Sequence, residues 1–218
     1  KVSVAEYQSF GRGRENRQWF SPFGSGICFS IFQETTNIKS PIGLSVYLGV
    51  KILDCLENLG LKGIKVKWPN DFYFNNKKLG GLLIELNQNS SDNLVATVGL
   101  GINYRLPSNH KWDDTLLHSA TDIHSIKDDI EIGRNFLTSK LINLVTNSLD
   151  SFNEKSLKDL QLVWCNLDML FGKQLKIQVG DHIYQGVDGG IDSQGQLILD
   201  NNGMSKKVIS GHILEWNK

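Results

Sequence analysis

The spacing of apolar and polar positions predicts a chain rich in β-strands. Residues 27–32 are mostly β-branched or aromatic and lie between Gly26 and a polar stretch, which is typical of a strand. Asn75, Asn76 and Lys77 separate two further apolar segments and predict a hairpin turn. The succession indicates a largely antiparallel meander, with other strands expected over residues 2–7, 64–68, 72–74, 79–86 and 94–104.

A long helix is predicted near the start of the chain. Ser40 is a favourable N-cap, Pro41 fits the first helical position, and Gly60 marks the end. The apolar residues of this helix recur every three to four positions and would form one buried face: Leu44, Leu48, Ile52, Leu56 and Leu59.

Two more helices are expected after a polar, loop-like stretch over residues 107–129. The shorter one covers residues 156–164, where Ser156 would be the N-cap and Asp159 its capping-box partner. The longer one covers residues 132–152, and its apolar positions are Phe136, Leu137, Leu141, Leu144, Val145 and Leu149.

The pattern changes after Asp168 to short strands, expected over residues 173–179, 183–187, 196–199 and 206–209. Glycine-containing turn signals separate them, and short strands at this spacing are typical of a small barrel-like module. We therefore expect two domains, one over residues 1–169 and a small C-terminal β-barrel domain over residues 170–218.

Composition narrows the functional classes. The 218 residues are 40% hydrophobic and 21% charged, and 23 Lys and Arg balance 23 Asp and Glu. A net charge of zero argues against a general nucleic-acid or membrane-surface binder. The three cysteines are far apart, so no metal site is expected, and Cys28 and Cys55 read as core residues. Neither a transmembrane-length apolar run nor a signal-peptide pattern occurs, and a cytoplasmic location fits best.

The most informative stretch is a basic, glycine-containing segment at residues 11–19, which we call the arginine loop. Gly11 and Gly13 let the backbone wrap closely around a ligand, and Arg12 and Arg14 supply forked donors for phosphate or carboxylate oxygens. Trp19 offers a face on which a base could stack. An ordinary solvated basic loop would have the same composition, so both interpretations remain open.

Two further segments are candidates for binding. Lys67 lies at the end of an alternating strand, where Trp68 and Pro69 could hold its charge toward a pocket, although a solvent-facing amine is the simpler interpretation. Gly99 and Gly101 would allow a ligand or another backbone to approach, and tight packing would explain them equally well.

Together these segments resemble the biotin–protein ligase family. The matches are in family order and extend over nearly the whole chain: Glu6 to Gln8 with Gly11 to Arg14, then residues 19–24, 67–71, 78–85, 99–103, 189–192 and 210–211. The resemblance implies an α+β fold, with a mixed, largely antiparallel sheet and packed helices in a class II synthetase-like catalytic domain, followed by a small β-barrel domain.

The family's reaction has two steps. Biotin's carboxylate attacks the α-phosphate of ATP, usually with Mg²⁺, and gives biotinyl-AMP and pyrophosphate. The biotinyl group then passes to a lysine of a biotin-carrier domain, such as that of acetyl-CoA carboxylase. No protein nucleophile is needed, because charge neutralisation and positioning of two anions suffice. By motif position, the resemblance assigns catalysis to Lys67 and Arg14, biotin binding to these two with Gln8, Arg12 and Gly13, and adenylate binding to Trp19 and Asn103.

Departures from the family qualify the resemblance. Glu15 and Asn16 stand where the loop often continues Arg-Gly, which would loosen the hold on the adenylate. Residues 211–216 stand where the family often has Gly-Glu and a strand ending in Arg. The family's Ser/Thr-Asn biotin segment would lie upstream of Lys1, so we expect the chain to be N-terminally incomplete. It also lacks the helix-turn-helix domain of some members, and no DNA binding is expected. A homodimer is left open.

Two rival functions remain. One is a lipoate or octanoate transfer enzyme of the same broad fold, and the other is a non-catalytic biotin- or nucleotide-binding module. The arginine loop and the segment from Lys67 to Asp71 favour biotin. Pyrophosphate release that requires both biotin and ATP would distinguish the three.

Overall fold

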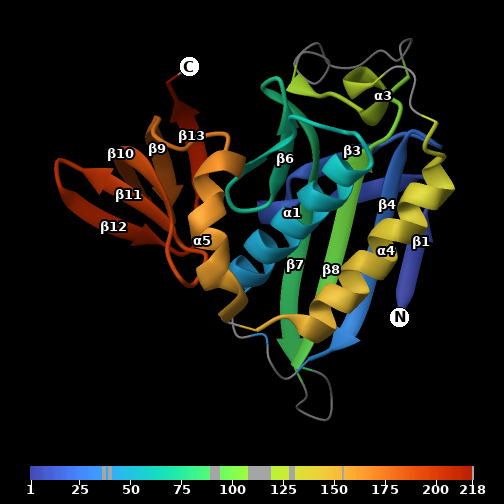
Figure 1. The fold of residues 1–218 in the computed structure, drawn as a ribbon, viewed down its shortest axis with the longest axis horizontal. Helices are drawn as coiled ribbons and strands as arrows, with labels where there is room; N and C mark the ends of the chain where they lie inside the picture. Colours follow the sequence, from blue (N-terminus) through green and yellow to red (C-terminus); the bar gives the residue numbers. More distant parts are fainter. Residues whose placement is uncertain are drawn as a thin grey trace.

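The computed structural model describes residues 1–35, 38, 41–88, 94–107, 119–127, 131–153 and 155–217. Its larger sheet has six strands in the order β1-β4-β8-β7-β6-β5, and every neighbouring pair is antiparallel (Figure 1). The predicted meander is thereby confirmed. The strands are β1 (Val2–Ala5), β4 (Gly26–Glu34), β5 (Lys65–Lys67), β6 (Asp71–Phe74), β7 (Lys77–Gln88) and β8 (Leu94–Asn103).

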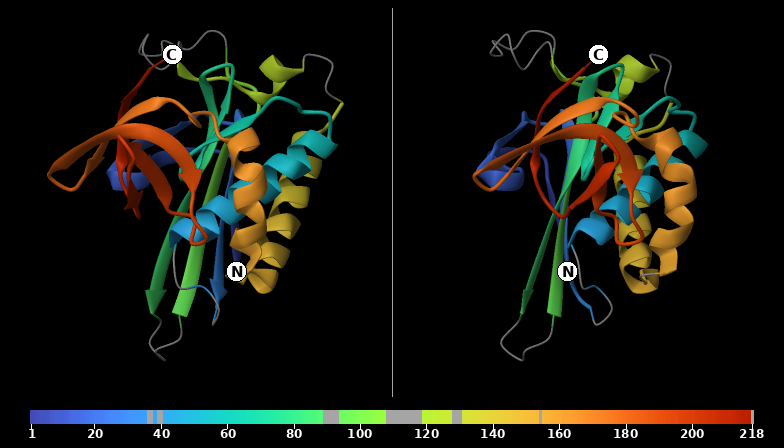
Figure 2. Two further views of the ribbon diagram at one scale, coloured as in Figure 1. Left: turned by 60° about the vertical axis from the view of Figure 1, so that its left-hand side comes forward. Right: turned by 90° about the vertical axis from the view of Figure 1, so that its left-hand side faces the viewer.

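Part of the arginine loop forms a two-stranded ribbon rather than an irregular loop. Strand β2 (Gln8–Arg12) pairs with β3 (Gln18–Ser21), and the short 3-10 helix η1 (Arg14–Asn16) connects them. Figure 2 shows the ribbon on the face of the large sheet that points away from the helices. The ribbon therefore stands over one side of the sheet, where it can enclose a space.

The predicted helices are present on the other face. Helix α1 (Pro41–Asn58) packs against the sheet and against α4 (Arg134–Ser151) and α5 (Lys155–Leu167) (Figure 1). The expectation of one apolar face on α1 was too narrow, because its neighbours bury it on nearly all sides. Gly43 is needed there, since an added Cβ would lie 2.9 Å from Leu157 Cδ1.

Several local predictions were wrong. A short helix, α3 (Ile123–Ile126), interrupts the predicted loop, and Asp122 caps it by accepting from the Ser125 amide at 2.7 Å. Ser156 lies inside α5, where its amide donates to Asn153 Oδ1 at 3.2 Å, so Ser156 is not the N-cap. Phe136 is 58% exposed instead of buried. The proposed cap Ser40 and residues 108–118 and 128–130 lie outside the described residues.

The second sheet is antiparallel and contains β9 to β13, with β12 and β13 at its two edges. Strand β13 was not predicted, whereas the other four follow the expected segments. Helix α5 packs against both α1 and β10 of the second sheet, and the division at residue 169/170 stays a prediction. The strands are β9 (Gln174–Val179), β10 (His182–Ile191), β11 (Leu197–Asn201), β12 (Met204–Val208) and β13 (His212–Trp216).

Two remaining expectations concern the cysteines and the membrane. Cys28 and Cys55 are buried and unbridged, which confirms them as core residues, and Cys165 is exposed. Over the ranges that the structure describes, no helix combines the length and the apolar character needed to cross a bilayer.

A pair of buried carboxyl groups lies at the junction between α5 and the second sheet. Asp168 accepts hydrogen bonds from Trp164 Nε1 at 2.7 Å and from the Leu170 amide at 2.9 Å. Asp188 accepts from the Gly190 amide at 2.8 Å, while its Oδ2 is buried without a hydrogen-bond partner among the described residues. Burial raises the pKa of Asp168 to about 6, and burial together with the neighbouring Asp168 raises the pKa of Asp188 to about 8.

This pair makes stability depend on pH. Because both pKa values are raised above the unfolded value of about 4, the pair's stabilising contribution is complete below that pH and is lost as pH rises through about 6 to 8. Asp188→Asn is therefore expected to flatten the fall in melting temperature between about pH 5 and about pH 9. Thermal unfolding of this variant, beside a control Asp181→Asn at an exposed turn, measures the effect. Equal slopes for wild type and Asp188→Asn would contradict it.

Candidate functional site

The β2–β3 ribbon and the adjacent face of β7 and β8 enclose a cavity of about 380 Å³. Five of the seven residues proposed from the sequence line this cavity: Gln8, Arg12, Gly13, Arg14 and Trp19. Residues that lie far apart in the sequence join them, including Ser30 and Glu85. The arginine loop is thus one wall of a pocket, and the alternative of a plain solvated loop does not describe it.

Gly101 on β8 leaves room for Trp19 of the arginine loop. An added Cβ at Gly101 would lie 2.7 Å from Trp19 Cε2, so the indole packs directly against the backbone of β8. Close approach of Trp19 therefore explains the glycine at 101. Within the described residues, Trp19 Nε1 is buried against β8 and has no hydrogen-bond partner.

Cations gather at one end of the cavity. Arg14 Nη1 donates to Asn70 Oδ1 at 3.5 Å, and burial lowers the pKa of Arg14. Lys78 Nζ lies 2.7 Å from Asp71 Oδ1, and an added Cβ at Gly81 would lie 2.8 Å from the same Asp71 oxygen. The four cationic side chains of the lining (Arg12, Arg14, Arg17 and Lys78) therefore outnumber its two carboxylates (Asp71 and Glu85), which suits an anionic ligand.

Lys67 lies beside this cluster, on the edge strand β5 opposite Asp71 in register. Its ammonium lies 4.2 Å from the centre of the Trp216 ring and 5.7 Å from that of Tyr73. Burial lowers the pKa of Lys67 to about 8, while the charge of Asp71 opposes the shift and Lys78 adds to it. Lys67 is not among the described residues that line the cavity, but its register partner Asp71 is.

Asn103 is placed differently. It lies at the end of β8, where its side-chain amide donates to the carbonyl oxygens of Thr121 at 2.9 Å and Lys78 at 3.5 Å. These bonds join the segment before α3 to the start of β7. Asn103 is not among the described residues that line the cavity, and its contact with phosphates stays a prediction.

Three residues of the site were given no role from the sequence. Asn70, Asp71 and Lys78 all line the cavity, and each belongs to a segment that matches the family. Their place in those segments was a signal that could have found them. Trp216 carried no such signal, because its segment departs from the family pattern.

The unusual pair in the arginine loop has left-handed backbone conformations. Glu15 has a φ of 56° and Asn16 a φ of 57°. Asn tolerates this region better than most residues, which fits its place where the family often has glycine. Glu15 and Arg17 form an ion pair of 3.4 Å in which both side chains are exposed, so the pair adds little stability. A looser hold on the adenylate stays a prediction.

A second cavity, of about 430 Å³, lies between the arginine loop and the second sheet. Arg14 and Glu15 line it from one side, and Gln178, Ser210 and His212 line it from the other. Burial and the nearby charge of Arg17 lower the pKa of His212. The arginine loop therefore borders both cavities, and the second sheet forms the opposite side of the second one.

Comparisons with known proteins agree with this geometry. Residues 1–103 match the family model described as "Biotin/lipoate A/B protein ligase family". The chain is 34% identical to the bifunctional ligase/repressor BirA of Salmonella typhimurium over 96% of the chain and 65% of that protein. It is 26% identical to the biotin–[acetyl-CoA-carboxylase] ligase of Mycobacterium tuberculosis over 98% of the chain and 78% of that protein.

The fold has a solved counterpart. A biotin protein ligase from Aquifex aeolicus, in complex with biotin and ATP, aligns with a TM-score of 0.82 and 27% identity over all of this chain and 88% of that one. The α+β prediction is confirmed by this match. The chain spans just under two thirds of the length of the BirA relatives. Over nearly its whole length the chain is thus similar to biotin–protein ligases, and its fold matches that of a solved one.

Proposed function

We propose that this chain activates biotin with ATP to biotinyl-AMP and then transfers the biotinyl group to a lysine of a biotin-carrier protein. The observation that carries the proposal is the cavity, in which forked cationic donors from the arginine loop face a glycine-containing sheet surface. Similarity to a ligase that was solved with biotin and ATP supports the same substrates here.

Adenylation brings together two groups that repel each other, a carboxylate and a triphosphate. Arg14 and Lys67 would offset this repulsion and the charge that develops at the α-phosphate. Lys67 suits the task, because with a pKa of about 8 it is mostly protonated near neutral pH. One carboxylate oxygen attacks phosphorus and pyrophosphate leaves, so the protein needs no nucleophile of its own.

The remaining roles follow the positions in the pocket. Gln8, Arg12 and Gly13 would hold biotin, and Trp19 would offer its ring to the adenylate. Asn103 is retained as an adenylate residue by motif position only. In the second step the carrier's lysine amine attacks the biotinyl carbonyl carbon, the bond to the phosphate oxygen breaks, and AMP leaves with loss of a proton from the amine.

We leave magnesium as a prediction that the described residues do not test. Within the described ranges there is no group of three or more His, Cys, Asp or Glu side chains suited to a metal. Asp71 is already paired with Lys78 at 2.7 Å. Since Mg²⁺ can be carried by nucleotide phosphates, it stays a prediction as a cofactor, and no step is assigned to it.

The other proposals concern the setting of the reaction. We place the activity in the cytoplasm, expect a carboxylase carrier domain as the partner, and expect no nucleic-acid binding by this chain. The division into residues 1–169 and 170–218 is proposed on the two separate sheets. A homodimer is left open.

Pyrophosphate release tests the proposal. The full-length protein should release pyrophosphate only when biotin and ATP are both present, and lipoate or octanoate should not replace biotin. Release with lipoate or octanoate instead would support the rival transfer enzyme. Absence of release with any acid would leave a binding module and would overturn the ligase proposal.

A further inference from the structure

A register shift in β13 sets the position of Trp216. Opposite β9, Ile213 pairs with Ile177 and Trp216 pairs with Leu175, with a register shift between Ile213 and Glu215. A bulge adds one residue to a strand and re-aims the side chains that follow it. Because Leu175 and Ile177 are two residues apart on one strand, the shift brings Trp216 to the same face as Ile213.

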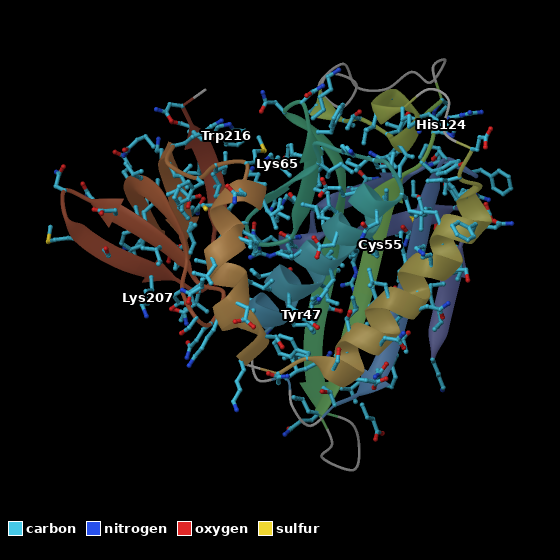
Figure 3. The ribbon with its side chains drawn as sticks, viewed as in Figure 1. Tyr47, Cys55, Lys65, His124, Lys207 and Trp216 are labelled. Atoms are coloured by element: carbon cyan, nitrogen blue, oxygen red, sulfur yellow. The ribbon has the colours of Figure 1, made fainter. Side chains whose placement is uncertain are left out.

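The face of β13 that carries Trp216 is the apolar one. Leu175, Ile177 and Ile213 are all buried there, whereas Glu215 is exposed and pairs with Lys176 at 3.3 Å. Figure 3 labels Trp216 on β13 and Lys65 on β5, the strand that ends at Lys67. Through Trp216 the second sheet contacts Lys67 at the end of β5.

The contact itself is a cation–π interaction. Lys67 Nζ lies 4.2 Å from the centre of the Trp216 ring, well inside the distance of about 6 Å at which such contacts are significant. An aromatic face holds an ammonium in place without neutralising it, which an acidic partner would do. The charge of Lys67 thus remains available to anions on its other sides.

We propose that Trp216 is a positioning residue, whose ring seats the Lys67 ammonium beside the cavity so that the second sheet takes part in adenylation. This rests on the proposed function for its consequence, whereas the contact can be tested without substrate. The indole ring gives Lys67 a neutral partner at the end of this strand.

The surroundings of Lys67 set its titration. Trp216 shields it from water on one side, and this shielding contributes to the burial that lowers the pKa of Lys67 to about 8. Because the ring both shields Lys67 from water and attracts its charged form, removal of the ring should change this pKa. The other titratable groups near Lys67 are Asp71, Tyr73, Lys78, Arg17 and His212.

Fluorine NMR of the protein labelled with 5-fluorotryptophan tests the contact in the absence of substrate. Trp216→Phe identifies the Trp216 signal among the labelled tryptophans. That signal should shift with a midpoint near pH 8, and the shift should disappear in Lys67→Met. A Trp216 signal that is insensitive to pH, or that titrates unchanged in Lys67→Met, would overturn the proposal.

Two variants test the consequence for the reaction. Trp216→Leu should lower the kcat of biotin-dependent pyrophosphate release by about tenfold with a smaller change in KM for ATP, whereas Trp216→Phe should retain most of the rate. The midpoint of the alkaline fall in rate should shift in Trp216→Leu and stay in place in Trp216→Phe. Equal kcat and equal pH profiles for Trp216→Leu and wild type would refute the positioning role. If wild type releases no pyrophosphate, the proposed function fails, while the NMR titration still decides on the contact.

Discussion

Lys67→Met is expected to lower biotin-dependent pyrophosphate release by about 100- to 1,000-fold, the effect typical of losing one preorganised charge at a reacting centre. Methionine is close to lysine in length and shape, so packing against Trp216 and Tyr73 should persist. The variant should also melt no lower than wild type, because a partly desolvated cation has been removed.

Lys65→Met is the matched control. Lys65 is on the same strand and has the same side chain, but it is exposed and donates to the Asn166 carbonyl away from the cavity. Its replacement should leave the rate close to that of wild type. In wild type the rate should fall as pH rises through about 8, because the protonated form of Lys67 is the active one. Full activity of Lys67→Met would remove Lys67 from the mechanism.

Gly11→Ala should reduce adenylate formation by about 10- to 100-fold, since small misplacements of positioning groups have effects of this size. An added Cβ would lie 2.5 Å from the Trp19 carbonyl oxygen, which is a backbone atom that cannot move aside cheaply. Gly11 and Trp19 are register partners, so the β2–β3 ribbon would separate at the point where it carries Arg12 and Trp19.

The ribbon is a separate two-stranded sheet, so the fold should survive this change. Circular dichroism and melting should therefore stay close to wild type while the apparent affinity for biotin and ATP falls. Gly133→Ala is the control for glycine replacement in general, because nothing lies within 4 Å of its added Cβ. An unchanged rate in Gly11→Ala would show that the ribbon does not position the substrates.

The spacing of apolar residues was sufficient to predict the regular helices and strands. It was insufficient where an element departs from regular spacing. The apolar repeat from Leu44 to Leu56 identified α1, but it could not show that α4 and α5 cover the helix's other sides. Strand β13 was missed, because its bulge breaks the alternation that identifies a strand. The start of α5 was misjudged, since Ser156 lies inside the helix and its amide donates to Asn153 Oδ1.

The site was predictable where its residues lie within motifs. Gln8, Arg12, Arg14 and Trp19 are close in sequence, and the structure brings them to one cavity. The surroundings of Lys67 were not predictable, because Trp216 meets it only through the packing of two sheets. Asn103 also lies within a motif, but it does not line the described cavity. Its side-chain amide donates to the Thr121 carbonyl oxygen instead.

Transfer to a carrier is the measurement that tests the central proposal most directly. The full-length protein is incubated with biotin, ATP and a biotin-carrier domain of a carboxylase, and the carrier is then analysed by intact-mass and peptide mass spectrometry. We expect one biotinyl group on a single lysine, only when biotin and ATP are both present, and far less with Lys67→Met. A carrier that remains unmodified under these conditions would contradict the proposal.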